Sequence, residues 1–228
     1  MSQSPSADSF AIRLGRLDAC CISDAGDRIG LKPAVTGIAS QSARRRIAGR
    51  VATVTLAAGN APSGSQRHLC TAAIERAEAG DIIVVEQRTG IDAAGWGGIL
   101  STAAQIRGLA GVIVEGPARD IDEAADLGFP VYSRSATCRT ARGRIHEAAS
   151  GDPVTIGETT VHEGDYAVAD SSGIMFIPAA RVEELLATAE AIAAREAAMT
   201  TAVRAGDPVS QVMGARYEQM LDKSGDAA

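Results

Sequence analysis

The hydrophobic positions of the chain alternate between short apolar runs and stretches with helical spacing. The run "DIIVVE" at 81–86 has the length and the β-branched content of a buried strand. Residues 99–107 instead place apolar side chains at helical intervals before a glycine, and a second apolar run follows at 111–115. A strand is also expected at 48–56, where Val and Thr alternate, and a helix at 67–79. This alternation predicts an α/β fold.

The two ends of the chain predict further helices, with short strands between them. Residues 10–29 suit a first helix that is broken at Gly26. Residues 178–206 are rich in Ala and Glu, start with Pro and end with Gly, as expected of a long helix, and 208–221 suit one more. Four short apolar runs bounded by turn residues predict a β-rich second sheet, at 129–133, 153–156, 166–170 and 174–177.

The composition fits one soluble domain. Of the 228 residues, 46% are hydrophobic and 3% aromatic, which indicates an aliphatic core and excludes a disordered chain. We expect a flexible segment at residues 1–9 and a single domain at residues 10–228. The sequence shows no leader and no run of about 20 apolar residues, and its four cysteines lack a disulfide or CxxC spacing, so a cytoplasmic location without a membrane partner is expected.

The charge of the chain restricts its ligands. A formal net charge of −6 and a pI near 5.1 argue against nucleic acid as a partner, because the protein as a whole repels polyphosphates. The basic run at residues 44–46 fits an exposed loop or a subunit contact. An anionic ligand therefore needs a local positive site.

Such a site is expected where the helix at 99–107 begins. If the strands at 81–86 and 111–115 flank this helix in a β-α-β unit, they are parallel and the crossover is right-handed. The start of the helix and the end of the second strand then share the carboxyl edge of the sheet, where open α/β sheets bind ligands. Gly97 would thus lie near Arg119 and Asp120, although 119 − 97 = 22 residues separate Gly97 from Arg119.

The residue types at these two ends suit a small carboxylate beside a divalent cation. The free amides of Gly97, Gly98, Ile99 and Leu100 favour an anion, because the helix dipole lies behind them and glycine lets a ligand approach. Arg119 can fork onto a carboxylate or stabilise an enolate oxygen, and Asp120 is a hard oxygen ligand for Mg²⁺. The alternatives are a surface ion pair and an ordinary turn. Trp96 would pack over the ligand-binding loop or at a subunit contact.

These residues resemble the RraA-like family, which includes 4-hydroxy-4-methyl-2-oxoglutarate aldolases, oxaloacetate decarboxylases and the regulator of ribonuclease E activity. The resemblance covers most of the chain, and the third of its five segments is highly specific. The segments are "AGRVATV" from residue 48, "AEAGDIIVVE" from 77, "AGWGGILSTAAQIRGLAGVIVEGPARD" from 94, "GFPVYS" from 128 and "VHEGDYAVADSSGIMFIP" from 161.

The resemblance implies a swivelling β/β/α-type sandwich that assembles into homotrimers or homohexamers, with active sites at subunit boundaries. It implies Mg²⁺ or Mn²⁺ at Asp120, a pyruvyl group at Arg119, and a carboxylate on the amides of residues 97–100. A further acidic residue of the family comes from a late helix of the neighbouring subunit, and Glu196 is the best match here. A solvated helix face is the alternative for Glu196.

Position 98 departs from the family. The common text is G-E-L-L or a similar sequence with a polar or acidic second residue, whereas this chain has Gly98, which offers only backbone. The resulting hypothesis is a metal-dependent lyase that cleaves a C–C bond of a 2-oxo acid through a pyruvate enolate, as an aldolase, a decarboxylase or both. Because only the aldol reaction needs a base for the 4-hydroxyl, the glycine favours decarboxylation or an unusual aldol substrate.

Two further functional hypotheses were considered for this chain. The chain could instead be a non-catalytic regulator that binds ribonuclease E, in which case a metal ligand at Asp120 would serve no purpose. A cofactor-dependent methyltransferase lacks a cofactor-binding motif in this sequence. The scattered His68, His146 and His162 do not have the spacing of a zinc site, and Ser171 and Ser172 have no partnered histidine that would support serine catalysis.

Overall fold

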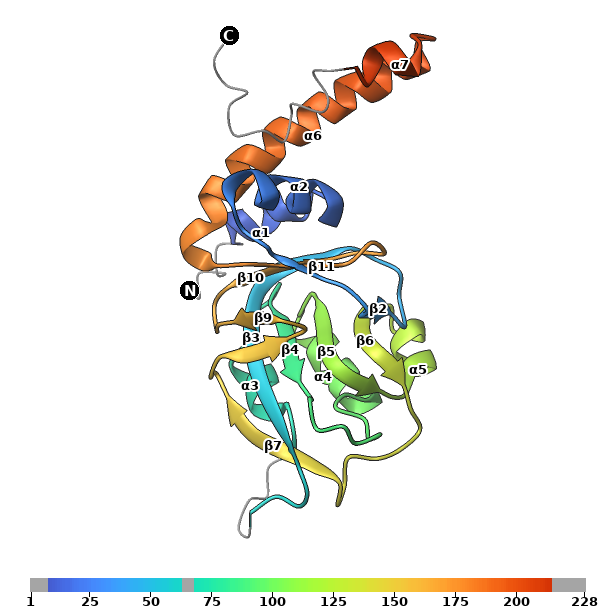
Figure 1. The fold of residues 1–228 in the computed structure, drawn as a ribbon. Helices are drawn as coiled ribbons and strands as arrows, with labels where there is room; N and C mark the ends of the chain where they lie inside the picture. Colours follow the sequence, from blue (N-terminus) through green and yellow to red (C-terminus); the bar gives the residue numbers. More distant parts are fainter. Residues whose placement is uncertain (1–7, 63–67, 215–228) are drawn as a thin grey trace, which may run out of the picture.

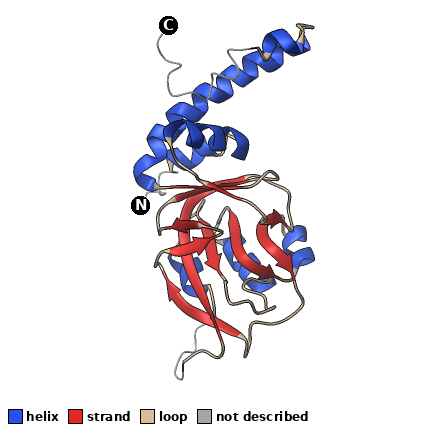
Figure 2. Ribbon diagram, viewed as in Figure 1, coloured by secondary structure: helices blue, strands red, loops and turns tan. Residues whose placement is uncertain are grey.

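A computed structural model of the protein describes residues 8–62 and 68–214. The chain forms a mixed α/β structure around one curled, mixed sheet, with helices on two sides (Figures 1 and 2). The sheet order is β1-β11-β10-β3-β4-β5-β6-β2, and β7 pairs with β3. The predicted α/β class is therefore confirmed.

The strands and helices have the following bounds. The strands are β1 Ala34–Val35, β2 Ala39–Ser40, β3 Ile47–Ala58, β4 Ile82–Glu86, β5 Gly111–Ala118, β6 Val131–Ala136, β7 Ile145–Ser150, β8 Val154–Ile156, β9 Thr159–Val161, β10 Tyr166–Ala169 and β11 Ile174–Ile177. The helices are α1 Ser9–Leu14, α2 Ala19–Ile29, α3 Thr71–Arg76, α4 Gly98–Ile106, α5 Ile121–Asp126, a 3₁₀ turn Ala179–Arg181, α6 Val182–Arg204 and α7 Val209–Val212.

The predicted β-α-β unit is present. Strands β4 and β5 are parallel, with Ile82 opposite Gly111 and Glu86 opposite Glu115, and α4 connects them. All five residues of β4 except Glu86 are buried, as expected of a strand covered on both faces. The start of α4 and the end of β5 therefore lie at one edge of the sheet.

Strand β3 joins two kinds of pairing. Its first residues pair antiparallel with β10, and its later residues pair parallel with β4 on one side and antiparallel with β7 on the other. The sheet curls along this strand (Figure 1). The predicted second sheet is thus wrong in part, because β6, β10 and β11 belong to the main sheet and only the β8–β9 hairpin stands apart.

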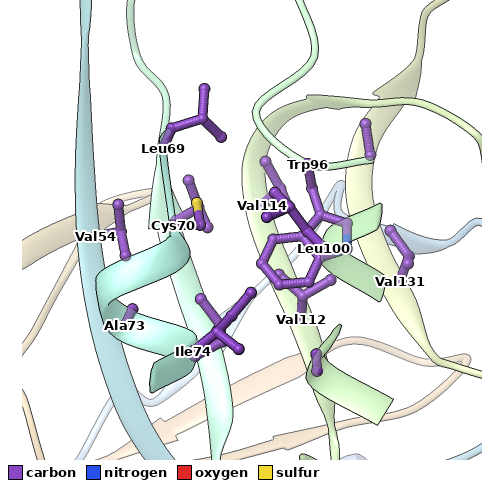
Figure 3. Packing of buried hydrophobic residues seen from close by; sticks show 14 of the residues in the cluster. Val54, Leu69, Cys70, Ala73, Ile74, Trp96, Leu100, Val112, Val114 and Val131 are labelled. Atoms are coloured by element: carbon purple, nitrogen blue, oxygen red, sulfur yellow. The ribbon is translucent and has the colours of Figure 1, made fainter. Parts of the chain in front are cut away.

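Three apolar clusters hold the layers together. Helices α3, α4 and α5 pack on one face of β3–β6, and Figure 3 shows this cluster around Trp96, Leu100 and Val114. The opposite face packs against the β8–β9 hairpin and the inner side of β10 and β11. Helices α1, α2 and α6 cover the outer side of β10 and β11.

The N-terminal helix differs from its prediction. The chain forms two helices there, with the break at residues 15–18 and not at Gly26. Asp18 starts α2 by accepting a hydrogen bond from the amide of Cys21 at 2.8 Å. Gly26 lies within α2 and packs closely against Pro33, whose Cδ would lie 2.7 Å from an added Cβ.

The other element predictions need smaller corrections. Helix α3 is shorter than the predicted 67–79, because Cys70 has a positive φ of 64° and Ala77 is already extended. The long helix is confirmed as α6, whereas α7 covers only part of the predicted 208–221, of which residues 215–221 lie outside the described residues. Strand β7 and helix α5 were not predicted, because their sequences "IHEAAS" and "IDEAAD" are short and lack a clear apolar period. In the part of the chain that the structure describes, no helix combines the length and the apolar composition needed to cross a bilayer.

Candidate functional site

The structure brings the start of α4 and the end of β5 together. The amide of Gly98 donates to Oδ2 of Asp120 at 2.8 Å, and the amide of Arg119 donates to the carbonyl of Trp96 at 3.0 Å. A third bond runs from the amide of Gly95 to the carbonyl of Pro117 at 2.9 Å. These three bonds fasten the glycine loop to the turn after β5.

A small cavity of about 90 Å³ opens at this junction. All six residues proposed for the site from the sheet-edge geometry line it, namely Gly97, Gly98, Ile99, Leu100, Arg119 and Asp120.

The turn at Asp120 aims two adjacent side chains at one cavity. Neighbouring residues of an extended strand face opposite sides, so a change of backbone direction is needed. The register of β5 shifts between Val114 and Pro117, and Asp120 itself has a positive φ of 55°. Aspartate tolerates this left-handed conformation better than most residues. As a result, Nε of Arg119 lies 3.2 Å from Oδ2 of Asp120.

Several polar groups of this junction have no partner among the described residues. The Oδ2 atom of Asp120 takes both of the bonds above, whereas its Oδ1 atom takes none. Hydrogen-bond partners among the described residues are also missing for the two Nη groups of Arg119 and for the amides of Gly97, Ile99 and Leu100. Both charged side chains are partly exposed, Arg119 by 39% and Asp120 by 31%. The amide of Gly98 is taken by Asp120, so three of the four predicted amides remain for an anion.

The side chain of Trp96 anchors the glycine loop before α4 to the apolar core. Its side chain lies in the apolar cluster of Figure 3, is 1% exposed, and stacks on Phe129 with ring centroids 6.2 Å apart. Its Nε1 donates to Oγ of Ser101 in the first turn of α4 at 2.9 Å. Trp96 is therefore a core residue of this chain that also touches the cavity, and the predicted subunit contact is wrong for its side chain.

The cavity also includes residues that the sequence analysis did not propose. Exposed His68 and Thr140 line it from two other segments of the chain. The loop that carries Thr140 is held against the glycine loop by a bond from the amide of Ala94 to the carbonyl of Arg139 at 3.0 Å. No pattern near Thr140 indicates this contact, because it depends on where β6 and β7 place a loop between them.

Glu196 lies elsewhere in the same chain. It is on α6, beside α2, and lines a different hollow near the far end of that helix. Burial, together with the nearby charges of Asp18 and Asp24, raises the pKa of Glu196. In Figure 1, α6 lies above β10 and β11, whereas α4 lies below them. A role for Glu196 in the site of a neighbouring subunit stays a prediction.

The donor set suits a cation with few protein ligands. The described residues contain no group of three or more His, Cys, Asp and Glu side chains that could hold a metal ion together. Asp120 nevertheless keeps an unused carboxylate oxygen at the cavity. Because Mg²⁺ usually keeps several waters and takes only one or two carboxylates, Asp120 fits this cation.

The fold and the site together define an α/β protein with a small acidic and cationic cavity at the carboxyl edge of its parallel strands. The chain matches the RraA-like family, described as Aldolase/RraA, over residues 19–176. It therefore belongs to the RraA-like family, which confirms the resemblance found in the sequence.

Individual relatives agree with this assignment. Protein DlpA of Legionella pneumophila is 26% identical over 190 residues, which cover 83% of this chain and 31% of DlpA. A protein of Halalkalibacterium halodurans that is provisionally named a 4-hydroxy-4-methyl-2-oxoglutarate aldolase is 28% identical, over 79% of this chain and 82% of its own length. The crystal structure of an uncharacterized Pseudomonas syringae protein matches with a TM-score of 0.80 and 28% identity, over 93% of this chain and 100% of that chain. The chain thus spans about a third of DlpA and most of the other two.

Proposed function

We propose that the protein is a divalent-metal-dependent lyase that cleaves a C–C bond of a 2-oxo acid and releases pyruvate through its enolate. The single observation that supports this most is the free Oδ1 of Asp120 beside the free Nη groups of Arg119 in one small cavity. The provisional aldolase name of the Halalkalibacterium relative supports the same reaction class.

Different groups of the chain would contact different parts of the substrate. The amides of Gly97, Ile99 and Leu100 lie at the positive end of the α4 dipole and would hold the substrate carboxylate. Arg119 would place its guanidinium against the ketone oxygen and stabilise the negative charge that gathers there when the bond breaks. Asp120 is held in place by the amide of Gly98, so its geometry is set before the substrate arrives.

The cofactor in this proposal is Mg²⁺ or Mn²⁺, with Asp120 as its protein ligand. When bound, the cation would act as a Lewis acid toward the substrate's ketone oxygen. The electron pair of the broken C–C bond passes into the enolate, and the enolate takes up a proton to give pyruvate. The second product is carbon dioxide in decarboxylation, or a carbonyl compound when the 4-hydroxyl of an aldol substrate loses its proton.

We also propose that the chain forms homotrimers or homohexamers and has the swivelling β/β/α arrangement of its family. Ile99, which lines the cavity, and Ile106, at the other end of α4, are 87% and 81% exposed. Val203, Val209 and Met213 are exposed near the end of α6. Such apolar surfaces suit contacts between copies, and one of these contacts would carry Glu196 to a neighbouring site. Light scattering coupled to gel filtration measures the assembly directly.

The test of the reaction is a screen for pyruvate release. Purified protein is incubated with oxaloacetate and with 4-hydroxy-4-methyl-2-oxoglutarate in the presence of Mg²⁺ or Mn²⁺, and pyruvate is followed with lactate dehydrogenase. A parallel sample with the metal alone corrects for uncatalysed decarboxylation, and a chelator should stop the enzymatic part. If no 2-oxo acid is turned over with either metal, the lyase proposal fails and a non-catalytic regulator becomes the better account.

A further inference from the structure

The glycine at position 98 leaves space that another side chain fills. An added Cβ at Gly98 would overlap Oε2 of Glu123 and would lie 3.2 Å from Cβ of Asp120. The carboxylate of Glu123 thus occupies the place where this chain lacks the polar or acidic residue expected after Gly97. The acidic group that position 98 does not supply is present, but it comes from α5.

Backbone conformation does not explain the glycine. Gly98 is the first residue of α4, and its φ is not in the left-handed region that requires glycine. Glycine in a helix is less favourable than alanine by about 1 kcal/mol, so helix stability does not explain it either. Besides the close approach of a ligand that glycine allows, the structure shows one further physical reason, which is space for the Glu123 carboxylate.

Capping of α5 does not use the Glu123 carboxylate. Asp120 is the N-cap residue of α5, so Glu123 is the third residue of the helix. A glutamate at this position often accepts a hydrogen bond from the backbone amide of the N-cap residue. Among the described residues, Glu123 accepts no such bond, and its carboxylate has no ion pair. It lines a hollow that also includes Arg119 and Asp120. Its carboxylate is therefore both near the proposed cation ligand and unengaged.

We propose that Glu123 is the second carboxylate of the cation site, acting as a positioning residue in place of a side chain at 98. This inference rests on the proposed metal-dependent function. Mg²⁺ and Mn²⁺ sites of this kind retain waters, and a carboxylate next to the ligand holds such a site by accepting hydrogen bonds and by adding negative charge. Gly98 matters because any side chain there, unless it is itself acidic, would displace Glu123 without replacing its charge.

The experiment measures Mn²⁺ binding directly, by electron paramagnetic resonance of the free ion, without substrate. Glu123→Ala should weaken Mn²⁺ binding by about tenfold or more, the usual effect of losing an outer partner of a metal site. Asp126→Asn is the matched control, because Asp126 is an exposed acidic residue of the same helix and lies outside the cavities described above. The Mn²⁺ affinity of this variant should equal that of the wild type.

Two further variants separate a role at the cation from a role in helix stability. Gly98→Ala should weaken Mn²⁺ binding by displacing Glu123, while the melting temperature stays level or rises because alanine favours a helix. Gly98→Glu combined with Glu123→Ala should restore most of the lost affinity, since the acidic group then returns from α4. Circular dichroism verifies that each variant is folded.

The outcomes separate this inference from the function on which it rests. Loss of affinity in Glu123→Ala with recovery in the double variant supports it. If Glu123→Ala binds Mn²⁺ as the wild type does while Asp120→Ala does not, the role of Glu123 is overturned and the lyase proposal stands. If the double variant fails to recover affinity although folded, Glu123 acts only through the α5 helix and the inference is overturned. Absence of Mn²⁺ binding by the wild type would overturn both.

Discussion

Two Arg–Asp pairs of this molecule look alike in type and differ in what they leave unused. In the helical layer, Nη2 of Arg50 lies 2.9 Å from Oδ2 of Asp8, and at the sheet edge Nε of Arg119 lies 3.2 Å from Oδ2 of Asp120. Both aspartates also begin a helix, since Asp8 precedes α1 and Asp120 precedes α5. Distance and residue type alone would therefore not tell the two apart.

The hydrogen bonds distinguish them. Oδ1 of Asp8 accepts from the amides of Phe10 and Ala11, and its Oδ2 accepts from Arg50 and from the hydroxyl of Tyr166. Both oxygens thus serve the fold. Asp120 places both of its bonds on Oδ2 and does not cap its own helix with the side chain, so Oδ1 remains available at a cavity.

The comparison teaches how a functional aspartate is recognised from contacts. In a structural carboxylate both oxygens accept hydrogen bonds from the protein. In a ligand-binding carboxylate the protein orients the side chain, and one oxygen stays without a protein partner. Asp165 and Asp170 follow the first pattern, because each uses both oxygens on backbone amides. Asp120 has the second pattern of contacts, which is the one that its proposed role requires.

The largest expected effect is that of Asp120→Asn on turnover. The amide keeps the shape of the side chain but loses the negative charge, so the rate of pyruvate release should fall by roughly 100-fold or more, comparable to removing one strong electrostatic contact from a transition state. Steady-state kinetics with oxaloacetate and Mn²⁺ measures this. A variant that is folded and retains metal-dependent turnover would clear Asp120 of the role.

The next effect is stabilisation by the cation. With free Mn²⁺ at about 100 times its dissociation constant, the folded state should gain about 2.7 kcal/mol, which raises the melting temperature. The gain should vanish in Asp120→Asn and persist in Asp8→Asn, because only the first variant alters the proposed ligand. Equal shifts in both variants, seen by differential scanning fluorimetry, would place the cation elsewhere.

Asp8→Ala should lower stability without changing turnover, the opposite of what is expected for Asp120→Asn. Loss of the cap of α1 and of the bonds to Arg50 and Tyr166 should lower the free energy of unfolding by about 1–2 kcal/mol. Turnover per folded molecule should stay at the wild-type value. Urea unfolding followed by circular dichroism gives the first quantity, and a drop in turnover without a loss of stability would contradict the structural assignment.

The smallest effect is a pH dependence of the helical layer. Burial alone would raise the pKa of Asp8, but the hydrogen bonds from Tyr166, Ala11, Arg50 and Phe10 hold it below its ordinary value of 3.8. Because the folded pKa is lowered, Asp8 stabilises the fold above pH 3.8, and this contribution is lost as the pH falls through the folded value. The loss should amount to less than about 1 kcal/mol, as is usual for a partly exposed ion pair.

Urea unfolding between pH 3 and pH 6 measures this effect as a difference between the wild type and Asp8→Asn. The stability of the wild type should decline more steeply toward low pH, because only its Asp8 can take up a proton. Parallel curves would show that the Asp8 carboxylate does not contribute in this way.

The β-α-β unit and its converging ends were predictable from sequence because the rule that governs them is local. Parallel strands joined by one helix end at the same edge, so the start of α4 and Asp120 lie close together, and the amide of Gly98 donates to Asp120. The predicted helix at 178–206 was also secure, because its Pro and Gly boundaries and its composition agree.

Long-range pairing could not be predicted in the same way. Nothing in "YAVA" or "IMFI" shows that β10 pairs with the first residues of β3, since a short buried strand accepts many partners. The sequence did not indicate the proposed role of Glu123, because that role depends on the space that Gly98 leaves, which is visible only in three dimensions. The break before α2 could have been found, because Asp18 is a recognisable helix cap.

The most direct test of the central claim is a crystal structure with Mn²⁺ and oxalate, a stable mimic of the pyruvate enolate. Anomalous scattering from Mn²⁺ should appear beside Oδ1 of Asp120, with oxalate on Arg119 and the amides at the start of α4. Anomalous density at another place in the molecule, with the cavity beside Asp120 filled only by solvent, would contradict the account.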